Sequence, residues 1–169
     1  MGSRWLRLLK HRWVDDRRAR RLLGPDALQR LGAKVAASER HHSGEVRVCV
    51  EAGLPLSYLW RDATARERAV AMFGKLRVWD TEQNNGVLIY LLLADRSIEI
   101  VADRGLNRHV DAAQWAAIAD SMRTAFQGGA MEAGLGQAID AVDMLLTRHF
   151  PLREGEANPN ELPDEPAVQ

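Results

Sequence analysis

The sequence lacks most of the features that assign a function at once. Its 169 residues include one cysteine, Cys49, which excludes an intramolecular disulfide and the paired-cysteine motifs of metal and redox sites. Lysine plus arginine and aspartate plus glutamate number 23 each, so the net charge gives no reason to expect a nucleic-acid partner. The apolar stretch 87–94 is far shorter than the about 20 residues that span a bilayer. EF-hand, P-loop, HExxH and GxSxG motifs are also absent.

Charge of opposite sign is concentrated at the two ends of the chain. Residues 1–22 carry eight Lys and Arg against two Asp, whereas residues 152–169 carry one Arg against five Asp and Glu. Such asymmetry is typical of partner contacts, or of two ends that contact each other. We predict a basic amphipathic helix in residues 1–23, a folded domain in 24–151, and an acidic, proline-rich extended tail in 152–169.

The N-terminal helix has an apolar, aromatic face. Trp5, Leu9 and Trp13 recur at the spacing of one helix face, and basic residues such as Arg7 surround them. One interpretation is that these residues contact an anionic membrane surface or a partner protein. The other is that the face docks onto the chain's own domain, which is the commoner fate of an apolar stripe.

Periodicity in the middle of the chain predicts an α/β fold. We expect helices at 26–40, 61–76, 111–127 and 135–149, and strands at 45–51, 87–94 and 98–102. Gly24-Pro25 should separate the first two helices, and Asp111 should cap the helix that follows it. The short connection between the last two strands makes them an antiparallel hairpin. The prediction is therefore a small mixed sheet with helices packed on it.

Two finer expectations concern burial. Strict alternation in residues 45–51 predicts a strand with one well-buried face, formed by its valines. In the helix 61–76, residues 66–68 are expected on a solvated face. The expected buried side consists of Ala63, Val70, Phe73 and Leu76.

Polar side chains gather at one end of the predicted hairpin. A hairpin places the start of its first strand beside the end of its second, which brings carboxylates, amides and an arginine within reach of one another. Oxygen ligands suit Ca²⁺ or Mg²⁺, and an arginine suits a phosphate or carboxylate. The candidate metal ligands are Asp80, Asn85 and Asp103. The full candidate binding set is Asp80, Glu82, Asn84, Asn85, Asp103, Arg104 and His109.

These residues also have a purely structural interpretation. The segments 84–86 and 103–105 have the composition of turns that enter and leave strands. Among the histidines, His109 is the one near the polar cluster, whereas adjacent His41 and His42 on a helix would diverge and share no metal. Cys49 is expected to be a small core residue rather than a nucleophile.

Several segments of the chain, in their order and spacing, resemble a known family. The most telling are Asn85-Gly86-Val87-Leu88-Ile89-Tyr90 and Ile100-Val101-Ala102-Asp103-Arg104-Gly105. With segments 43–48, 71–79, 126–129 and 149–151, they resemble the TPM domain family, a YgcG-like family related to a thylakoid-lumen phosphatase. The resemblance covers residues 35–151. It implies an α/β sandwich with a small mixed sheet between helices. It also implies weak acid phosphatase activity, as in plant members, or divalent-cation binding, as in some bacterial ones.

The chain departs from the family pattern in the candidate site. Asn84 stands where many members have an aspartate, and Ala102 and Asp103 stand in what is often a Gly-x-Gly turn. Phosphatase activity is therefore less expected for this chain. The signal peptide and C-terminal membrane helix of many members have no counterpart in this sequence. We accordingly expect a cytoplasmic protein, at most peripheral to the inner face of a membrane.

The sequence favours one function over an alternative. The favoured function is a non-enzymatic TPM-type domain that binds a protein partner, such as a membrane protein, or an anionic membrane surface. A weak Ca²⁺ or Mg²⁺ site would accompany it. The alternative is a metal-dependent or acid phosphatase that uses Asp80, Asp103 and Arg104.

Overall fold

The computed structural model describes residues 7, 9, 11 and 16–169. Its centre is a four-stranded sheet with the strand order β3-β2-β1-β4. Strand β1 (Val46–Glu51) pairs in parallel with β2 (Val87–Leu92), and β2 forms an antiparallel hairpin with β3 (Ser97–Ala102). The predicted mixed sheet with an antiparallel hairpin is thus confirmed.

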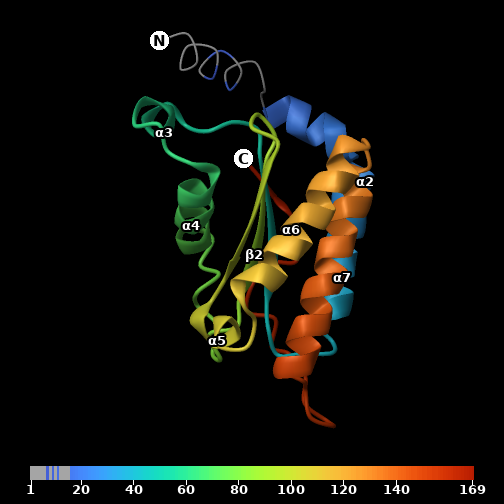
Figure 1. Ribbon diagram of the computed structural model, residues 1–169. Helices are drawn as coiled ribbons and strands as arrows, with labels where there is room; N and C mark the ends of the chain where they lie inside the picture. The colour runs from blue at the N-terminus through green and yellow to red at the C-terminus, as the bar shows by residue number, and fades with distance from the viewer. Residues whose placement is uncertain (1–6, 8, 10, 12–15) are drawn as a thin grey trace.

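Helices cover both faces of this sheet (Figure 1). On one face lie α2 (Asp16–Ser38), α6 (Ala112–Gln127) and α7 (Met131–His149). On the other face lie α3 (Leu56–Trp60) and α4 (Ala65–Lys75). The short helix α5 (Arg104–Asn107) follows β3 at one end of the sheet. The molecule is therefore a helix–sheet–helix sandwich, as predicted.

Local sequence sets most helix boundaries. Gly24 has φ of 69° and ψ of 156°, so the helical path breaks there, as its position before Pro25 predicts. Asp111 caps α6 by accepting a hydrogen bond from the Gln114 backbone N–H at 2.8 Å. Gly129, at φ of 79°, follows the end of α6.

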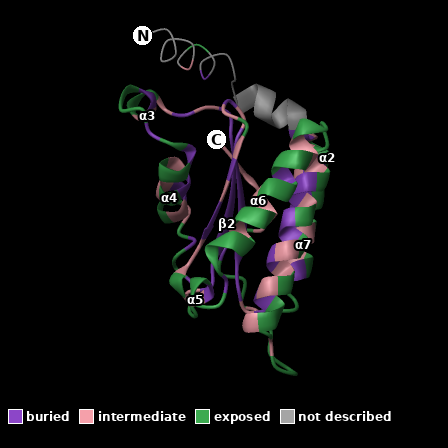
Figure 2. Ribbon diagram, viewed as in Figure 1, coloured by how far each residue is buried: buried purple, intermediate pink, exposed green. Residues whose placement is uncertain are grey.

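The core has two parts, one on each side of the sheet (Figure 2). Every residue of β1 is buried, which differs from the single buried face predicted from its alternation. The reason is the position of β1 between two strands and between two helical layers, which leaves no face for water. The polar positions of β1 are consequently enclosed, and Glu51 is only 3% exposed.

As predicted, Ala63 is buried and Phe73 and Leu76 pack against the core. The prediction was wrong for Val70 and incomplete for α4. Its buried residues are Ala65, Ala69 and Met72, whereas Val70 is 51% exposed. The small side chains of the alanines let the helix approach the sheet closely. The side of α4 that carries them is therefore the buried one. Arg68, expected on a solvated face, instead reaches under the helix to pair with Glu51 at 2.6 Å.

The C-terminal tail is part of the sheet. Strand β4 (Ala167–Val168) pairs in parallel with β1. Leu162 is buried in the core beside α4, and the Arg47 guanidinium donates a hydrogen bond of 2.6 Å to the carbonyl of Glu165. The tail is extended, and its contacts hold it along the domain.

Candidate functional site

Three of the predicted site residues meet where β2 begins and β3 ends. The Arg104 guanidinium donates two hydrogen bonds, of 2.9 and 3.1 Å, to the side-chain oxygen of Asn84. Asp103 caps α5, its carboxylate accepting the Arg104 backbone N–H at 2.6 Å. A Cβ at Gly105 would lie 2.4 Å from the Asn84 carbonyl, so this close approach requires glycine. The turn interpretation of these segments therefore accounts for much of their polarity.

Asn85 lies next to this cluster but is buried. Its backbone N–H donates to the Thr81 hydroxyl at 3.1 Å, and its side-chain amide donates to the Ser43 hydroxyl at 3.2 Å. The Oδ1 atom of Asn85 and the Oδ2 atom of Asp103 are buried and accept no hydrogen bond from the described residues. These two oxygens are what remains of the predicted cation site.

The other predicted site residues have different partners. Asp80 pairs with Arg77 at 2.5 Å, and the backbone N–H of Glu82 donates to the Glu161 carboxylate at 3.2 Å. The His109 ring stacks on His149 with a centroid separation of 4.8 Å. Within the described ranges, no three His, Cys, Asp or Glu side chains are placed to hold a metal ion.

The N-terminal residues that the structure describes contact the opposite end of the hairpin. Arg7 pairs with Asp62 at 2.7 Å and with Asp95 at 3.1 Å, and the buried His11 ring lies 2.9 Å from Asp95. Leu9 is 54% exposed. Trp5 and Trp13 lie outside the described residues. Arg7 and His11 therefore contact the domain through their side chains, whereas the side chain of Leu9 is exposed.

His41 and His42 do not diverge on a helix as expected, because α2 ends at Ser38. Both rings approach one oxygen of Asp143, at 3.5 and 3.4 Å. His42 is fully buried, and burial lowers the pKa of its imidazole. Nδ1 of His42 lies 3.0 Å from the carbonyl of Gly44, so a neutral ring donates its proton there. The bond to Gly44 lies within the loop, whereas the approach to Asp143 brings the two rings against α7.

Cys49 is unsuited to nucleophilic chemistry. Its side chain is fully buried in the α4 half of the core. Burial raises the pKa of its thiol to about 12, so the reactive thiolate is scarcely populated near neutrality.

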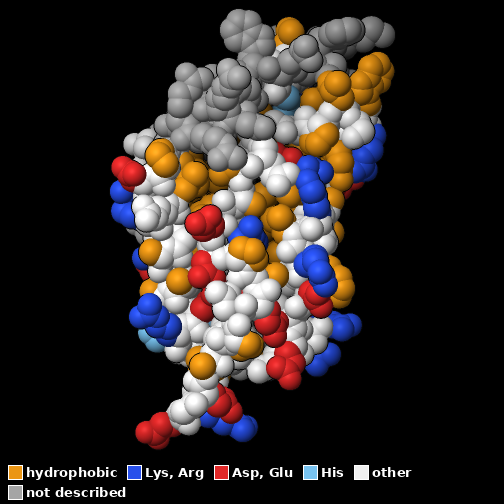
Figure 3. All heavy atoms as spheres, turned by 180° about the vertical axis from the view of Figure 1, so that it is seen from behind, with side chains coloured by type: hydrophobic (Ala, Val, Ile, Leu, Met, Phe, Trp, Pro, Cys, Tyr) orange, Lys and Arg blue, Asp and Glu red, His pale blue; other side chains and the backbone are white. Residues whose placement is uncertain are grey.

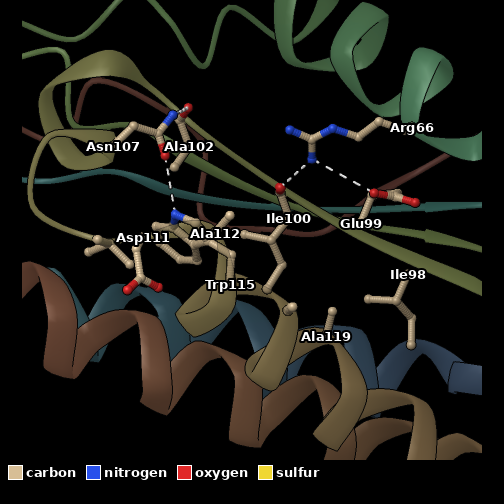
Figure 4. Close-up of a pocket in the computed structure, with 12 residues that line it drawn as sticks. Arg66, Ile98, Glu99, Ile100, Ala102, Asn107, Asp111, Ala112, Trp115 and Ala119 are labelled. Carbon is tan, nitrogen blue, oxygen red and sulfur yellow. Dashed lines mark hydrogen bonds and ion pairs between the residues drawn. The ribbon is translucent and has the colours of Figure 1, made fainter.

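A groove runs between the edge strand β3 and helix α6 (Figure 4). Its volume is about 480 Å³, within the range of about 300–1,000 Å³ that is usual for ligand sites. Its apolar lining comes from Ile98 and Ile100 of β3 and from Trp115 and the alanines of α6. The alanines Ala112, Ala116 and Ala119 lie along one side of the helix, so short side chains leave the groove open.

Side chains rather than a neighbouring strand cover the outer edge of β3 at this groove. Arg66 of α4 donates to the carbonyl of Ile100 at 2.5 Å and lies 3.7 Å from Glu99. Asn107 donates to the carbonyl of Ala102 at 2.7 Å and accepts from the indole N–H of Trp115 at 3.1 Å. Figure 4 shows these contacts along the edge.

The sequence analysis missed this groove because its walls come from distant segments. Two signals were present. Glu99 between two isoleucines is typical of a strand with a partly open position, and an alanine row beside Trp115 is typical of a helix that leaves room for another element. Neither signal indicates that the strand with Glu99 and the helix with Trp115 lie side by side.

Charges of both signs are interspersed on the face seen in Figure 3.

None of the helices that the structure describes combines the length and apolar character needed to cross a membrane.

The fold and the hairpin turns define an α/β sandwich of the TPM type. The model of the TPM domain matches residues 17–145, and the chain belongs to this family. The predicted resemblance is thereby confirmed. A search of curated proteins found no match.

Two solved structures resemble this one. The NMR structure of the BA42 protein from the psychrophilic bacterium Bizionia argentinensis superposes with a TM-score of 0.72 at 26% identity. The match covers 84% of this chain and 92% of that chain. The N-terminal domain of a P. gingivalis protein, also solved by NMR, gives a TM-score of 0.60 at 22% identity. It covers 78% of this chain and 83% of that domain, and it supports the fold alone.

Proposed function

We propose that this TPM domain is a non-enzymatic binding module that takes a segment of a protein partner in the β3–α6 groove. The observation that carries the proposal is the groove itself: an edge strand of the sheet faces an apolar helix side across about 480 Å³ of open space. Aromatic and apolar linings with few polar groups are typical of binding sites. Trp115 supplies a large ring with a polar N–H, the kind of side chain that often dominates binding energy.

The phosphatase alternative has weaker support. It needs Asp80, Asp103 and Arg104 around one phosphate, but Asp80 is engaged by Arg77 and Arg104 by Asn84. Asp103 is committed on one oxygen to capping α5. With one available carboxylate and, among the described residues, no cluster placed to hold a metal ion, a phosphate at this site would gain little transition-state stabilisation.

A groove-filling substitution tests the binding proposal. Ala116→Arg places a long side chain into the groove from an exposed position, whereas Ala117→Arg puts the same side chain on an exposed position of α6 outside the groove lining. The probe is a phage-displayed library of random linear peptides. Clones should be enriched on the native protein and on Ala117→Arg but not on Ala116→Arg. Enrichment of the same clones on all three proteins, or on none, would reject the groove as a binding site.

A weak divalent-cation site is a second proposal, for one specific reason. The buried Oδ1 of Asn85 and Oδ2 of Asp103 accept no hydrogen bond from the described residues, and hard cations are bound by such oxygens. Titration with CaCl₂ followed by residue-resolved NMR should shift residues 84–86 and 103–105. Asp103→Asn, which keeps a capping oxygen for α5, should abolish the shift. No shift in the native protein at millimolar calcium would end this idea.

A further inference from the structure

The edge of β3 has unused backbone hydrogen-bonding capacity. In the sheet that the described residues form, β3 has a neighbour, β2, on one side only. The Asp103 N–H bonds inward to the Gly86 carbonyl, so the alternation of an antiparallel pair turns the backbone groups of Ile98, Ile100 and Ala102 outward. Outward-facing N–H and C=O groups in a row are a template for another strand.

Arg66 supplies at this edge what a neighbouring strand would supply. Its Nη1 donates to the Ile100 carbonyl, where a strand would place a backbone N–H, and its charge faces the carboxylate of Glu99. Burial raises the pKa of Glu99, and the charges of Arg66 and Arg123 counteract this. The Arg66 side chain is 52% exposed, so it can turn into solvent with little loss of packing. Asn107 does the same for the Ala102 carbonyl.

We infer that the partner segment is an extended peptide of the pattern apolar-basic-apolar, an inference that rests on the proposed function. The peptide adds antiparallel to β3 as a further strand and displaces Arg66. A backbone N–H of the peptide donates a hydrogen bond to the Ile100 carbonyl in place of Arg66. Its two apolar side chains, opposite Ile98 and Ile100, enter the groove toward the alanine side of α6. Its basic side chain, opposite Glu99, replaces the charge that Arg66 withdraws, since opposite charges on directly facing residues stabilise a strand pair.

The geometry also specifies which peptide N–H groups matter. Residues of the peptide opposite Ile98 and Ile100 point their backbone toward β3, whereas the basic residue between them points its backbone away. N-methylation of an apolar residue therefore removes a hydrogen bond and adds a clash at the edge. N-methylation of the basic residue is the matched control, because that N–H faces away from β3.

The test uses acetylated and amidated Thr-Ile-Lys-Ile-Thr with the full-length chain. Methylating the backbone nitrogens of both isoleucines should weaken binding about tenfold or more, while methylating the lysine nitrogen should leave it nearly unchanged. Amide hydrogen exchange at Ile98, Ile100 and Ala102 should slow when the parent peptide binds. If both methylated peptides bind like the parent and exchange at these amides is unchanged, strand addition is rejected.

Two substitutions test the role of charge. Arg66→Ala removes the competing side chain and should tighten binding several-fold, whereas weaker binding would mean that Arg66 itself recognises the peptide and would overturn the displacement. Replacing the peptide lysine by glutamate should weaken binding about tenfold, and Glu99→Gln should largely abolish that preference. A preference that survives Glu99→Gln would contradict the pairing.

These outcomes separate peptide binding in the β3–α6 groove from addition of the peptide as a strand to β3. A peptide that is blocked by Ala116→Arg yet tolerates methylation of its isoleucines leaves groove binding intact and rejects strand addition. Binding that is insensitive to Ala116→Arg rejects the groove altogether.

Discussion

The fully buried hydroxyl of Tyr90 donates a hydrogen bond of 2.6 Å to Glu51, which also receives a two-pronged ion pair from Arg68. Burial raises the pKa of Tyr90 above its ordinary value, and hydrogen bonding to Glu51 raises the pKa of Arg68. These three side chains satisfy one another inside the α4 half of the core. A buried network of this kind is sensitive to the loss of one member, because the charge that remains is buried without a partner.

Removing the cation from this network should destabilise the protein markedly. We expect Arg68→Ala to lower the free energy of unfolding by about 3–5 kcal/mol, because it leaves the Glu51 charge buried and unpaired. Urea denaturation measures the change. Arg123→Ala is the control, since it breaks an exposed pair with Asp120 and should cost less than about 1 kcal/mol. Equal losses in the two variants would show that the Glu51 charge is not buried as described.

A second residue-scale prediction concerns pH. Burial raises the pKa of Glu39 to about 9, and the nearby carboxylates of Glu45 and Asp164 add to the effect. Between the unfolded pKa of about 4.5 and about 9, the folded state binds more protons than the unfolded state, so this group makes stability fall as pH rises.

Glu39→Gln removes this titration and keeps an oxygen to accept the Val46 backbone N–H, a bond of 2.9 Å in the native protein. Relative to the native protein, the variant should gain stability progressively from pH 5 to pH 9. The measurement is the free energy of unfolding of both proteins at several pH values. If the value for the variant minus that for the native protein stays constant or falls over this range, the raised pKa is contradicted.

At the scale of elements, the hairpin-distal side of β1 and the outer side of β3 are covered differently. Strand β4 covers β1 with backbone hydrogen bonds, such as the Ala52 N–H to the Gln169 carbonyl at 3.0 Å. Strand β3 is instead covered by the side chains of Arg66 and Asn107 at the carbonyls of Ile100 and Ala102. A backbone pair is a permanent closure, whereas a side-chain cap can be exchanged, and this contrast underlies the proposed binding edge.

The C-terminal tail should contribute measurably to stability through Leu162, which is 7% exposed in the α4 half of the core. Leu162→Ala should lower the free energy of unfolding by about 2 kcal/mol, the lower end for a buried leucine because the site is at the margin of the core. Leu56→Ala, at a position 55% exposed, should change it by about 0.5 kcal/mol or less. Chemical denaturation compares them, and equal effects would mean that the tail does not pack on the domain in solution.

The elements also explain which predictions from sequence succeeded. The apolar run of β2, the break at Gly24 and the cap at Asp111 each depend on local chemistry, and each was predicted correctly. Strand β4 was not predicted, because two residues that follow an acidic, proline-rich segment have no strand pattern of their own. In α4, Val70 was wrongly predicted as buried and Arg68 as solvated, because closeness to the sheet and the Glu51–Arg68 pair are tertiary effects.

At the scale of the whole molecule, the polar end of the hairpin and the groove have different characters. The hairpin end is largely satisfied by its own contacts, since Arg104 holds Asn84 and Asp103 caps α5. Of the seven candidate residues, sequence could place Asn84, Asp103 and Arg104 together because a hairpin dictates it. It did not show that Asp80 pairs locally with Arg77, and it could not place Glu82 or His109, whose partners Glu161 and His149 lie on separate segments of the chain. The groove, by contrast, is open and apolar, with exchangeable caps.

The central claim is that a protein partner binds at the β3–α6 groove, and residue-resolved NMR tests it most directly. A ¹⁵N-labelled sample is titrated with a library-selected peptide while backbone amides and the Trp115 indole N–H are followed. The account predicts saturable shifts at residues 98–102 and at the Trp115 indole, whose bond to Asn107 lies in the groove wall. Shifts confined to other surfaces, or a Trp115 indole signal unchanged at saturation, would contradict it.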